Sequence, residues 1–144
     1  MRDGKGKMGK SEGDGNCIYL SDTPEIIRKK VSRAVTDGGP TEENQVKPEA
    51  IQNLFDLMSI VSTPDTIAHF DELYNKMAIR YGDFKKQLAE DMIIANNPIR
   101  ERIEDIANDT DYLRKIANQG AAKARESAQK TIREVRELIG FKPF

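Results

Sequence analysis

Apolar residues recur at helical spacing along almost the whole chain after residue 22, and this periodicity restricts the fold more than any other feature. The most apolar segment follows Pro48, where an apolar stripe occupies one face of a helix. Its members are Ile51, Leu54, Phe55, Met58 and Val61. The sequence therefore predicts an all-α fold, a helical bundle with this helix as the core element.

Two proline-containing start signals support further helices. Thr23-Pro24 and Thr63-Pro64 place a capping residue before a proline that fits the first helical turn. In the first of these helices, Ile27, Val31, Ala34 and Val35 share an inward face, and Asp22 is a second candidate cap. The opposite face carries Arg28, Lys29 and Arg33. These cations indicate either a solvated surface or the extension of a phosphate-binding surface.

The second half of the chain contains helical stripes with two ambiguous interruptions. Pro98 predicts either one long helix kinked near residues 96–98 or two helices end to end. Residues 109–111 predict the cap of a short helix, and residues 118–120 the start of a last one that ends at Gly140.

The chain of 144 residues is long enough for one domain, but its composition allows only a lean core, with 38% hydrophobic and 33% charged residues. One cysteine and one histidine exclude a disulfide framework and a His/Cys zinc site, so we expect no metal centre. The apolar runs are too short for a membrane span, and no leader pattern opens the chain. We therefore expect a soluble, cytoplasmic protein.

Charge is unevenly distributed although the net charge is only −1. Residues 1–35 and 112–144 are basic, whereas residues 36–75 are strongly acidic. Two basic ends can contact separate points of one elongated ligand, or they reflect ordinary variation of surface charge.

The first sixteen residues contain five glycines alternating with Lys5, Lys7 and Lys10. Glycine at this density lets backbone N–H groups approach a ligand, and the ammonium groups add positive charge. From composition alone, the segment is either a phosphate-binding loop or a floppy chain end.

Within that segment, Lys7-Met8-Gly9-Lys10-Ser11 resembles the KMSKS signature loop of class I aminoacyl-tRNA synthetases. Gly9 stands where the motif has its first serine. Further runs are similar, in order and spacing, to the C-terminal half of bacterial tryptophanyl-tRNA synthetases, and together they cover nearly the whole chain. They are Asn16–Asp22, Ala34–Asp37, Tyr81–Lys85 with Leu88–Glu90, Pro98–Arg102, and Gly120-Ala121 with Lys123–Arg125.

The resemblance implies a catalytic role for the loop in ATP-dependent tryptophan activation. Residues 1–22 correspond to the signature loop and its lead-in, and residues 23–144 to a helical tRNA-binding domain. Lys7 and Lys10 match the catalytic lysines, which stabilise the charge developing on pyrophosphate. Together with Met8, Gly9 and Ser11 they are expected to bind ATP, which arrives with Mg²⁺ as a substrate, and no tightly bound cofactor is expected.

The same resemblance implies that the helices contact the anticodon region of tryptophan tRNA and support a homodimer. The basic C-terminal helices offer Arg114, Lys115, Lys123 and Arg125 as candidate phosphate contacts. A solvated helix face is the alternative for each of them. Neither a membrane nor DNA is expected as a partner.

The 144 residues contain no HIGH motif, tryptophan pocket or accompanying sheet. The chain by itself is therefore expected to be inactive, with ATP and tryptophan bound through a domain outside this sequence. The alternative is a stand-alone helical module that binds RNA or protein without catalysis.

Overall fold

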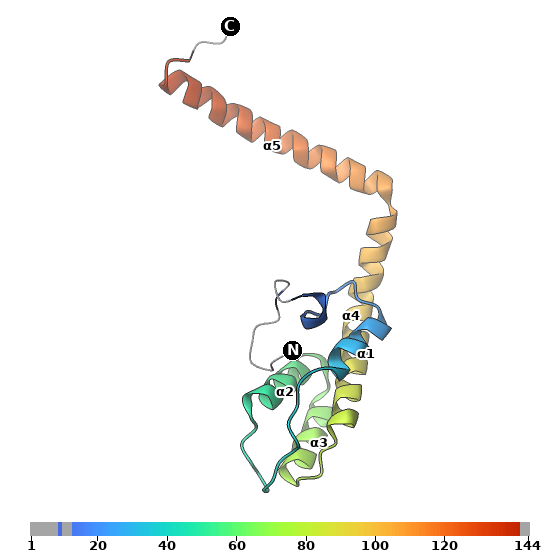
Figure 1. The fold of residues 1–144 in the computed structure, drawn as a ribbon. Coiled ribbons are helices and arrows are strands. Elements are labelled where there is room, and N and C mark those ends of the chain that lie inside the picture. The colour runs from blue at the N-terminus through green and yellow to red at the C-terminus, as the bar shows by residue number, and fades with distance from the viewer. Residues whose placement is uncertain (1–8, 10–12, 142–144) are drawn as a thin grey trace. The chain divides into compact units, whose positions relative to one another are not determined.

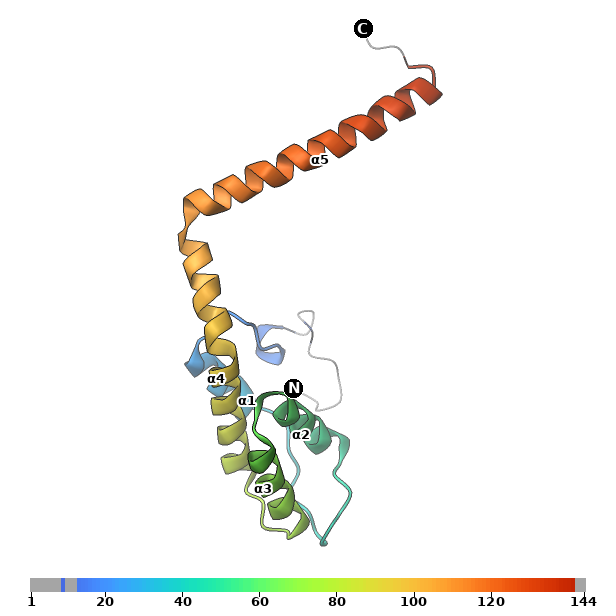
Figure 2. The same cartoon turned by 180° about the vertical axis from the view of Figure 1, so that it is seen from behind.

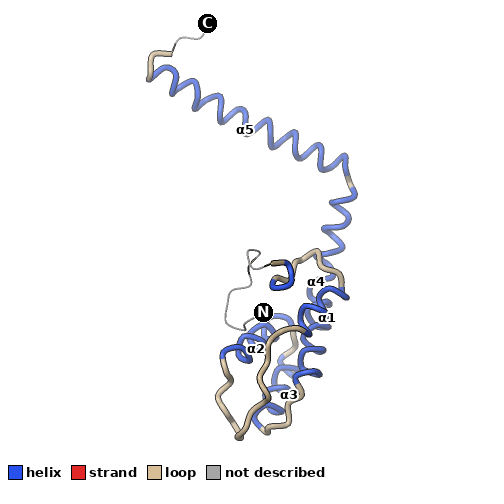
Figure 3. Tube along the Cα trace, viewed as in Figure 1, coloured by secondary structure: helices blue, strands red, loops and turns tan. Residues whose placement is uncertain are grey.

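The computed structural model describes Gly9 and residues 13–141. These residues form helices and loops without a strand, as Figure 3 shows. The order is a short 3-10 turn η2 (Asp14–Asn16), then α1 (Pro24–Ser32), α2 (Glu49–Val61), α3 (Pro64–Asn75), α4 (Tyr81–Asn108) and α5 (Thr110–Leu138). The predicted all-α fold is confirmed.

The chain divides into two compact units, residues 1–101 and 102–144. In the first unit, α1, α2, α3 and the beginning of α4 lie together as a helical bundle (Figures 1 and 2). The second unit consists mainly of α5. A boundary after residue 22, between a signature loop and a helical domain, stays a prediction.

The core of the first unit is built from the stripes that helical periodicity predicts. Helix α2 contributes four of its members, and α1, α3 and α4 supply all the others except Ala34, which follows the end of α1, so the four helices share one core. Phe55 of α2 lies at its centre, with its ring centroid 4.7 Å from that of Phe84 and 6.2 Å from that of Tyr74. The buried apolar residues are Ile27, Val31, Ala34, Ile51, Leu54, Phe55, Met58, Phe70, Tyr74, Phe84, Leu88 and Ala89.

The predicted helix starts hold with one change in the capping groups. Thr63 caps α3 through its hydroxyl, which accepts a hydrogen bond from the Thr66 amide at 3.3 Å. Thr23 is the N-cap residue of α1, but its side chain accepts no capping hydrogen bond. Helix α1 ends at Ser32, earlier than the apolar stripe indicates, and Val35 is consequently exposed rather than inward.

Helix α4 continues through Pro98, so the one-helix alternative is correct. The predicted break before Gly120 is wrong, because α5 is one helix of 29 residues. Asp109 caps it, accepting a hydrogen bond from the Tyr112 amide at 2.8 Å. Gly140 ends this segment with a φ of 73°, a conformation that favours glycine, as the sequence predicts.

Candidate functional site

The KMSKS-like segment is described only at Gly9, which is half-buried. The other members of the predicted ATP site, Lys7, Met8, Lys10 and Ser11, lie outside the described residues. Their catalytic and ATP-binding roles therefore stay predictions.

The segment that follows the loop is fastened to the helices by polar contacts. Asn16 is buried, and Ile18 packs against the core. The Asn96 side-chain amide of α4 donates a hydrogen bond to the Leu20 carbonyl at 3.0 Å. Residues 16–20, although without regular secondary structure beyond η2, thus have fixed attachment points on the bundle.

Asp22 is the centre of this attachment. Its Oδ2 accepts a hydrogen bond from the Tyr19 amide at 2.9 Å and from Lys30 Nζ at 2.6 Å. The Asp22 and Lys30 side chains are only 9% and 11% exposed, so the ion pair is largely shielded from water. Asp22 therefore connects the lead-in of the loop to α1, a role different from the helix cap that the sequence indicates.

Tyr19 completes this cluster. Its hydroxyl donates a hydrogen bond to Asp14 Oδ1 at 3.0 Å, and this bond raises the pKa of the phenol. The ammonium group of Lys30 lies 4.7 Å from the centre of the Tyr19 ring, within the range of a cation–π interaction. Sequence reasoning did not predict this cluster, because the residue spacing does not show which acidic side chain Lys30 contacts.

The four predicted tRNA contacts all lie on α5, and all four are exposed. At about 100° per residue, Arg114 and Arg125 are eleven residues apart and share one face, about 16 Å apart along the axis. Lys115 and Lys123 are rotated well away from that face. A single straight helix therefore presents Arg114 and Arg125 together, but not the whole set.

Nearby acidic groups lower the net positive charge around two of these candidates. Arg114 Nη1 lies 3.5 Å from Asp111 Oδ1 in an exposed ion pair. Lys123 lies at a shallow concavity of about 680 Å³ on α5. Its charged lining residues are Lys123, Lys130, Arg133, Glu126, Glu134 and Glu137. This lining is balanced in charge and is a weak attractor for phosphate.

The described residues hold no cluster of three or more potential metal ligands. His69 is exposed on α3, with its ring 5.2 Å from that of Phe70. Among the described helices, none has the length and apolar character needed to cross a membrane.

Comparison with known proteins shows the family to which the chain belongs. Residues 1–95 match the family model described as tRNA synthetases class I (W and Y). The chain belongs to this family of class I tRNA synthetases.

Within the family, the similar curated proteins are tryptophan–tRNA ligases. The protein of that name from Porphyromonas gingivalis is 54% identical over 97% of this chain and 42% of its own length. The one from Helicobacter pylori is 40% identical over 98% of this chain and 42% of its own length. The chain thus spans well under half the length of the relatives that it matches.

A solved structure agrees with the sequence matches. The crystal structure of tryptophanyl-tRNA synthetase from Campylobacter jejuni is 28% identical and covers 93% of this chain and 42% of its own, with a TM-score of 0.75. A second structure of that enzyme, complexed with ADP and tryptophan, gives the same TM-score. These findings confirm the resemblance to tryptophanyl-tRNA synthetases that the sequence motifs indicate.

Proposed function

We propose that this chain is a part of a tryptophan–tRNA ligase, in which residues 1–22 assist ATP-dependent activation of tryptophan and the helices bind tryptophan tRNA. The observation that carries the proposal is the 54% identity to a tryptophan–tRNA ligase along 97% of the chain. The KMSKS-like segment lies within the range matched by the family model, which supports the catalytic part.

In the proposed reaction, the tryptophan carboxylate attacks the α-phosphate of Mg²⁺-bound ATP, forming tryptophanyl-adenylate and releasing pyrophosphate. The ammonium groups of Lys7 and Lys10 stabilise the negative charge that develops on the leaving pyrophosphate. Gly9 gives the loop more backbone freedom than the serine of the motif and removes one hydroxyl. The other reacting groups lie outside this chain.

The attachment of residues 16–22 gives the loop a fixed end. Asp22 and Lys30 hold the lead-in to α1, and Asn96 holds the Leu20 carbonyl on α4. A loop that closes over a nucleotide needs such a stable base, because the positions of its lysines relative to the phosphates depend on it.

Transfer of tryptophan to its tRNA requires RNA binding as well as catalysis. The shared face of Arg114 and Arg125 supports a role for α5 in contacting tRNA phosphates. Tryptophan tRNA, ATP and tryptophan are the proposed partners, the proposed assembly is a homodimer, and the proposed location is the cytoplasm.

The experiment that tests this function replaces Lys10 in the full-length polypeptide that carries the chain. Lys10→Ala should slow tryptophan-dependent exchange of pyrophosphate into ATP by about 100-fold or more, in line with the loss of one charge-stabilising group. Lys29→Ala, an exposed lysine of α1, is the matched control and should keep the parent rate. Equal rates for Lys10→Ala and the parent would reject the catalytic role of the loop.

A further inference from the structure

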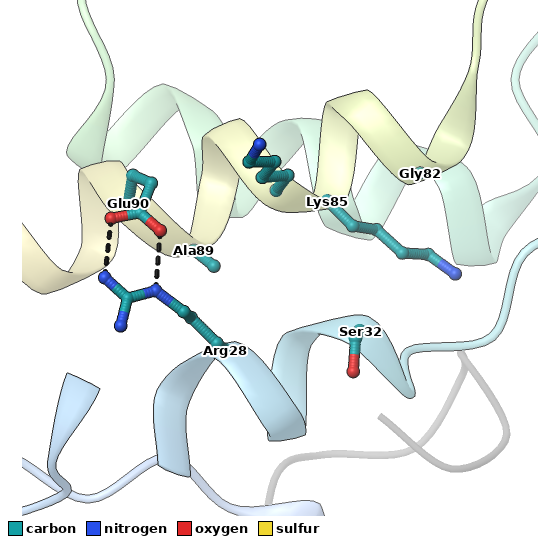
Figure 4. Close-up of a pocket in the computed structure, with 7 residues that line it drawn as sticks. Arg28, Ser32, Gly82, Lys85, Ala89 and Glu90 are labelled. Atoms are coloured by element: carbon teal, nitrogen blue, oxygen red, sulfur yellow. Dashed lines mark hydrogen bonds and ion pairs between the residues drawn. The ribbon is translucent and has the colours of Figure 1, made fainter. Parts of the chain in front are cut away.

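A groove lies between α1 and the beginning of α4, with a cavity volume of about 350 Å³ (Figure 4). We call it the α1–α4 groove. Its lining residues are Arg28, Ser32, Gly82, Lys85, Lys86, Ala89 and Glu90. The groove lies within the first compact unit and includes none of the predicted tRNA contacts.

The hollow exists because the two helices carry small side chains where they face each other. Ser32, Gly82 and Ala89 provide the least bulky part of the lining. A Cβ atom added at Gly82 would meet no other atom within 4 Å, so space remains open there. The longer basic side chains surround this space.

The lining has a positive charge excess, with three cations and one carboxylate. Arg28 forms a two-point ion pair with Glu90, in which Nε and Nη2 donate to the carboxylate at 2.7 and 2.9 Å, as the dashed lines in Figure 4 show. This pair fixes the guanidinium group in place and lowers the pKa of Glu90.

Lys85 contributes a charge that its hydrogen-bond acceptors leave uncompensated. Its ammonium group donates to the Ala34 carbonyl at 2.7 Å and to Thr36 Oγ1 at 3.0 Å, and both acceptors are neutral. Burial lowers the pKa of Lys85, so an anion beside the ammonium would favour its charged form.

We infer that the α1–α4 groove binds one nucleotide of an RNA strand through its phosphate, with Arg28, Lys85 and Lys86 as the cationic contacts. The inference deepens the proposed function, because it assigns part of tRNA binding to this groove. Arginine and lysine are the usual phosphate ligands. The Ser32 hydroxyl donates a hydrogen bond to the Lys29 carbonyl at 3.0 Å, so the positive charge of the groove comes from these three side chains.

The size and chemistry of the groove favour the RNA backbone over a base. A volume of about 350 Å³ lies at the lower end of the range for small-molecule pockets, and it suits a phosphate with its ribose. The lining contains no aromatic side chain, whereas base recognition in single strands generally uses aromatic stacking.

Helix α1 also supplies a matched comparison surface. Lys29 and Arg33 are exposed on the same helix but do not line the groove. General attraction of RNA to a basic helix would use these two cations as much as those of the groove. If RNA binds specifically in the groove, only the groove cations should contribute to the affinity.

The test measures binding of a tryptophan tRNA transcript to the full-length polypeptide at about 50 and 200 mM salt. Each lost phosphate contact should reduce the change in affinity between these salt concentrations by about 3-fold, and two by about 10-fold. The double variant Arg28→Gln/Lys86→Gln should therefore bind more weakly at low salt, and the ratio of its affinities at the two salt concentrations should be about 10-fold smaller than that of the parent. The control Lys29→Gln/Arg33→Gln removes the same charge and should keep most of the parent salt dependence.

A second variant fills the groove without changing its charge. Gly82→Leu should weaken tRNA binding at least several-fold, while circular dichroism shows unchanged helix content.

Three results would overturn the inference. They are equal effects of the two double variants, parent-like binding by Gly82→Leu, and absence of tRNA binding by the parent. The last would also reject the proposed function. If Arg114→Gln/Arg125→Gln weakened binding and the groove variants did not, the proposed function would stand and the groove assignment would fall.

Discussion

The ion pair between Asp22 and Lys30 should be a main determinant of how firmly the lead-in segment is attached to α1. Asp22→Ala removes the carboxylate that Lys30 Nζ contacts at 2.6 Å and the acceptor of the Tyr19 amide at 2.9 Å. Because both charged side chains are about nine-tenths shielded, each group left behind lacks full access to water.

The expected cost follows from this burial. Removing one partner of a buried pair costs about 3–5 kcal/mol, so the free energy of unfolding should fall by about 3 kcal/mol with Asp22→Ala. Asp22→Asn keeps an oxygen acceptor for the Tyr19 amide and should cost less, about 2 kcal/mol. Such losses are large against the 5–15 kcal/mol, roughly, that stabilise an ordinary domain.

Urea unfolding followed by near-ultraviolet circular dichroism of the tyrosines measures this free energy. Three of the four tyrosines, Tyr19, Tyr74 and Tyr81, lie in the first compact unit, so the signal reports on the bundle. The exposed pair of Glu72 on α3 and Lys76, the residue that caps the end of this helix, is the matched control, and Glu72→Ala should leave the free energy of unfolding nearly unchanged.

A double-mutant cycle decides whether the two groups act as a pair. The combined variant Asp22→Ala/Lys30→Ala should cost at least about 1 kcal/mol less than the sum of the single variants, because it leaves no charge without its partner. Additive costs within about 0.5 kcal/mol, or single costs as small as that of Glu72→Ala, would refute this reasoning.

Two further predictions concern the bundle. Phe55→Ala should lower the free energy of unfolding by about 3–5 kcal/mol, because Phe55 is 5% exposed and surrounded by core rings. Ile60→Ala, at a 78% exposed position of the same helix, should change it by about 0.5 kcal/mol or less. Similar costs of the two variants in urea unfolding would contradict the assigned core. Burial and the hydrogen bond that the Tyr81 hydroxyl donates to Asp37 at 2.8 Å raise the pKa of Tyr81. Above about pH 10 the unfolded chain therefore loses the phenol proton before the folded chain does, and the free energy of unfolding falls as pH rises. Tyr81→Phe should reduce that fall in urea midpoints between about pH 9 and 11, and an unchanged slope would exclude Tyr81 as its source.

The helices of the first unit could be predicted because local signals and tertiary packing agree there. The α2 stripe predicted Ile51, Leu54, Phe55, Met58 and Val61 as core residues. The first four are buried, and Val61 is half-buried and packs against them. Ile60, on the opposite face of the same helix, is 78% exposed.

The wrong predictions at helix ends and caps involve residues that can play more than one structural role. Residues 118–120 resemble a helix start, yet glycine inside a helix costs only about 1 kcal/mol, and α5 continues through Gly120. Asp22 is a common capping residue, but its carboxylate is used by Lys30 instead. Local preference does not decide between such uses; contacts between distant residues do.

The α1–α4 groove could not be predicted from sequence spacing. Arg28 and Glu90 are 62 residues apart, and nothing in either helix alone shows that they pair. The small residues that create the hollow, Ser32 and Gly82, are typical of helix ends and turns when considered singly. Only the packing of α1 against α4 gives them a common role.

Helix α4 combines two regimes of local stability in one continuous element. Pro98 has no amide hydrogen to donate to the Ile94 carbonyl, so the ladder of backbone hydrogen bonds has a gap there. The buried residues of α4 all precede that gap; they are Phe84, Leu88 and Ala89. Amide hydrogens around these residues should exchange with solvent only when the whole bundle opens, whereas those beyond Pro98 should exchange through local fraying. The end of α4 can therefore unwind and reform many times during the life of one folded core.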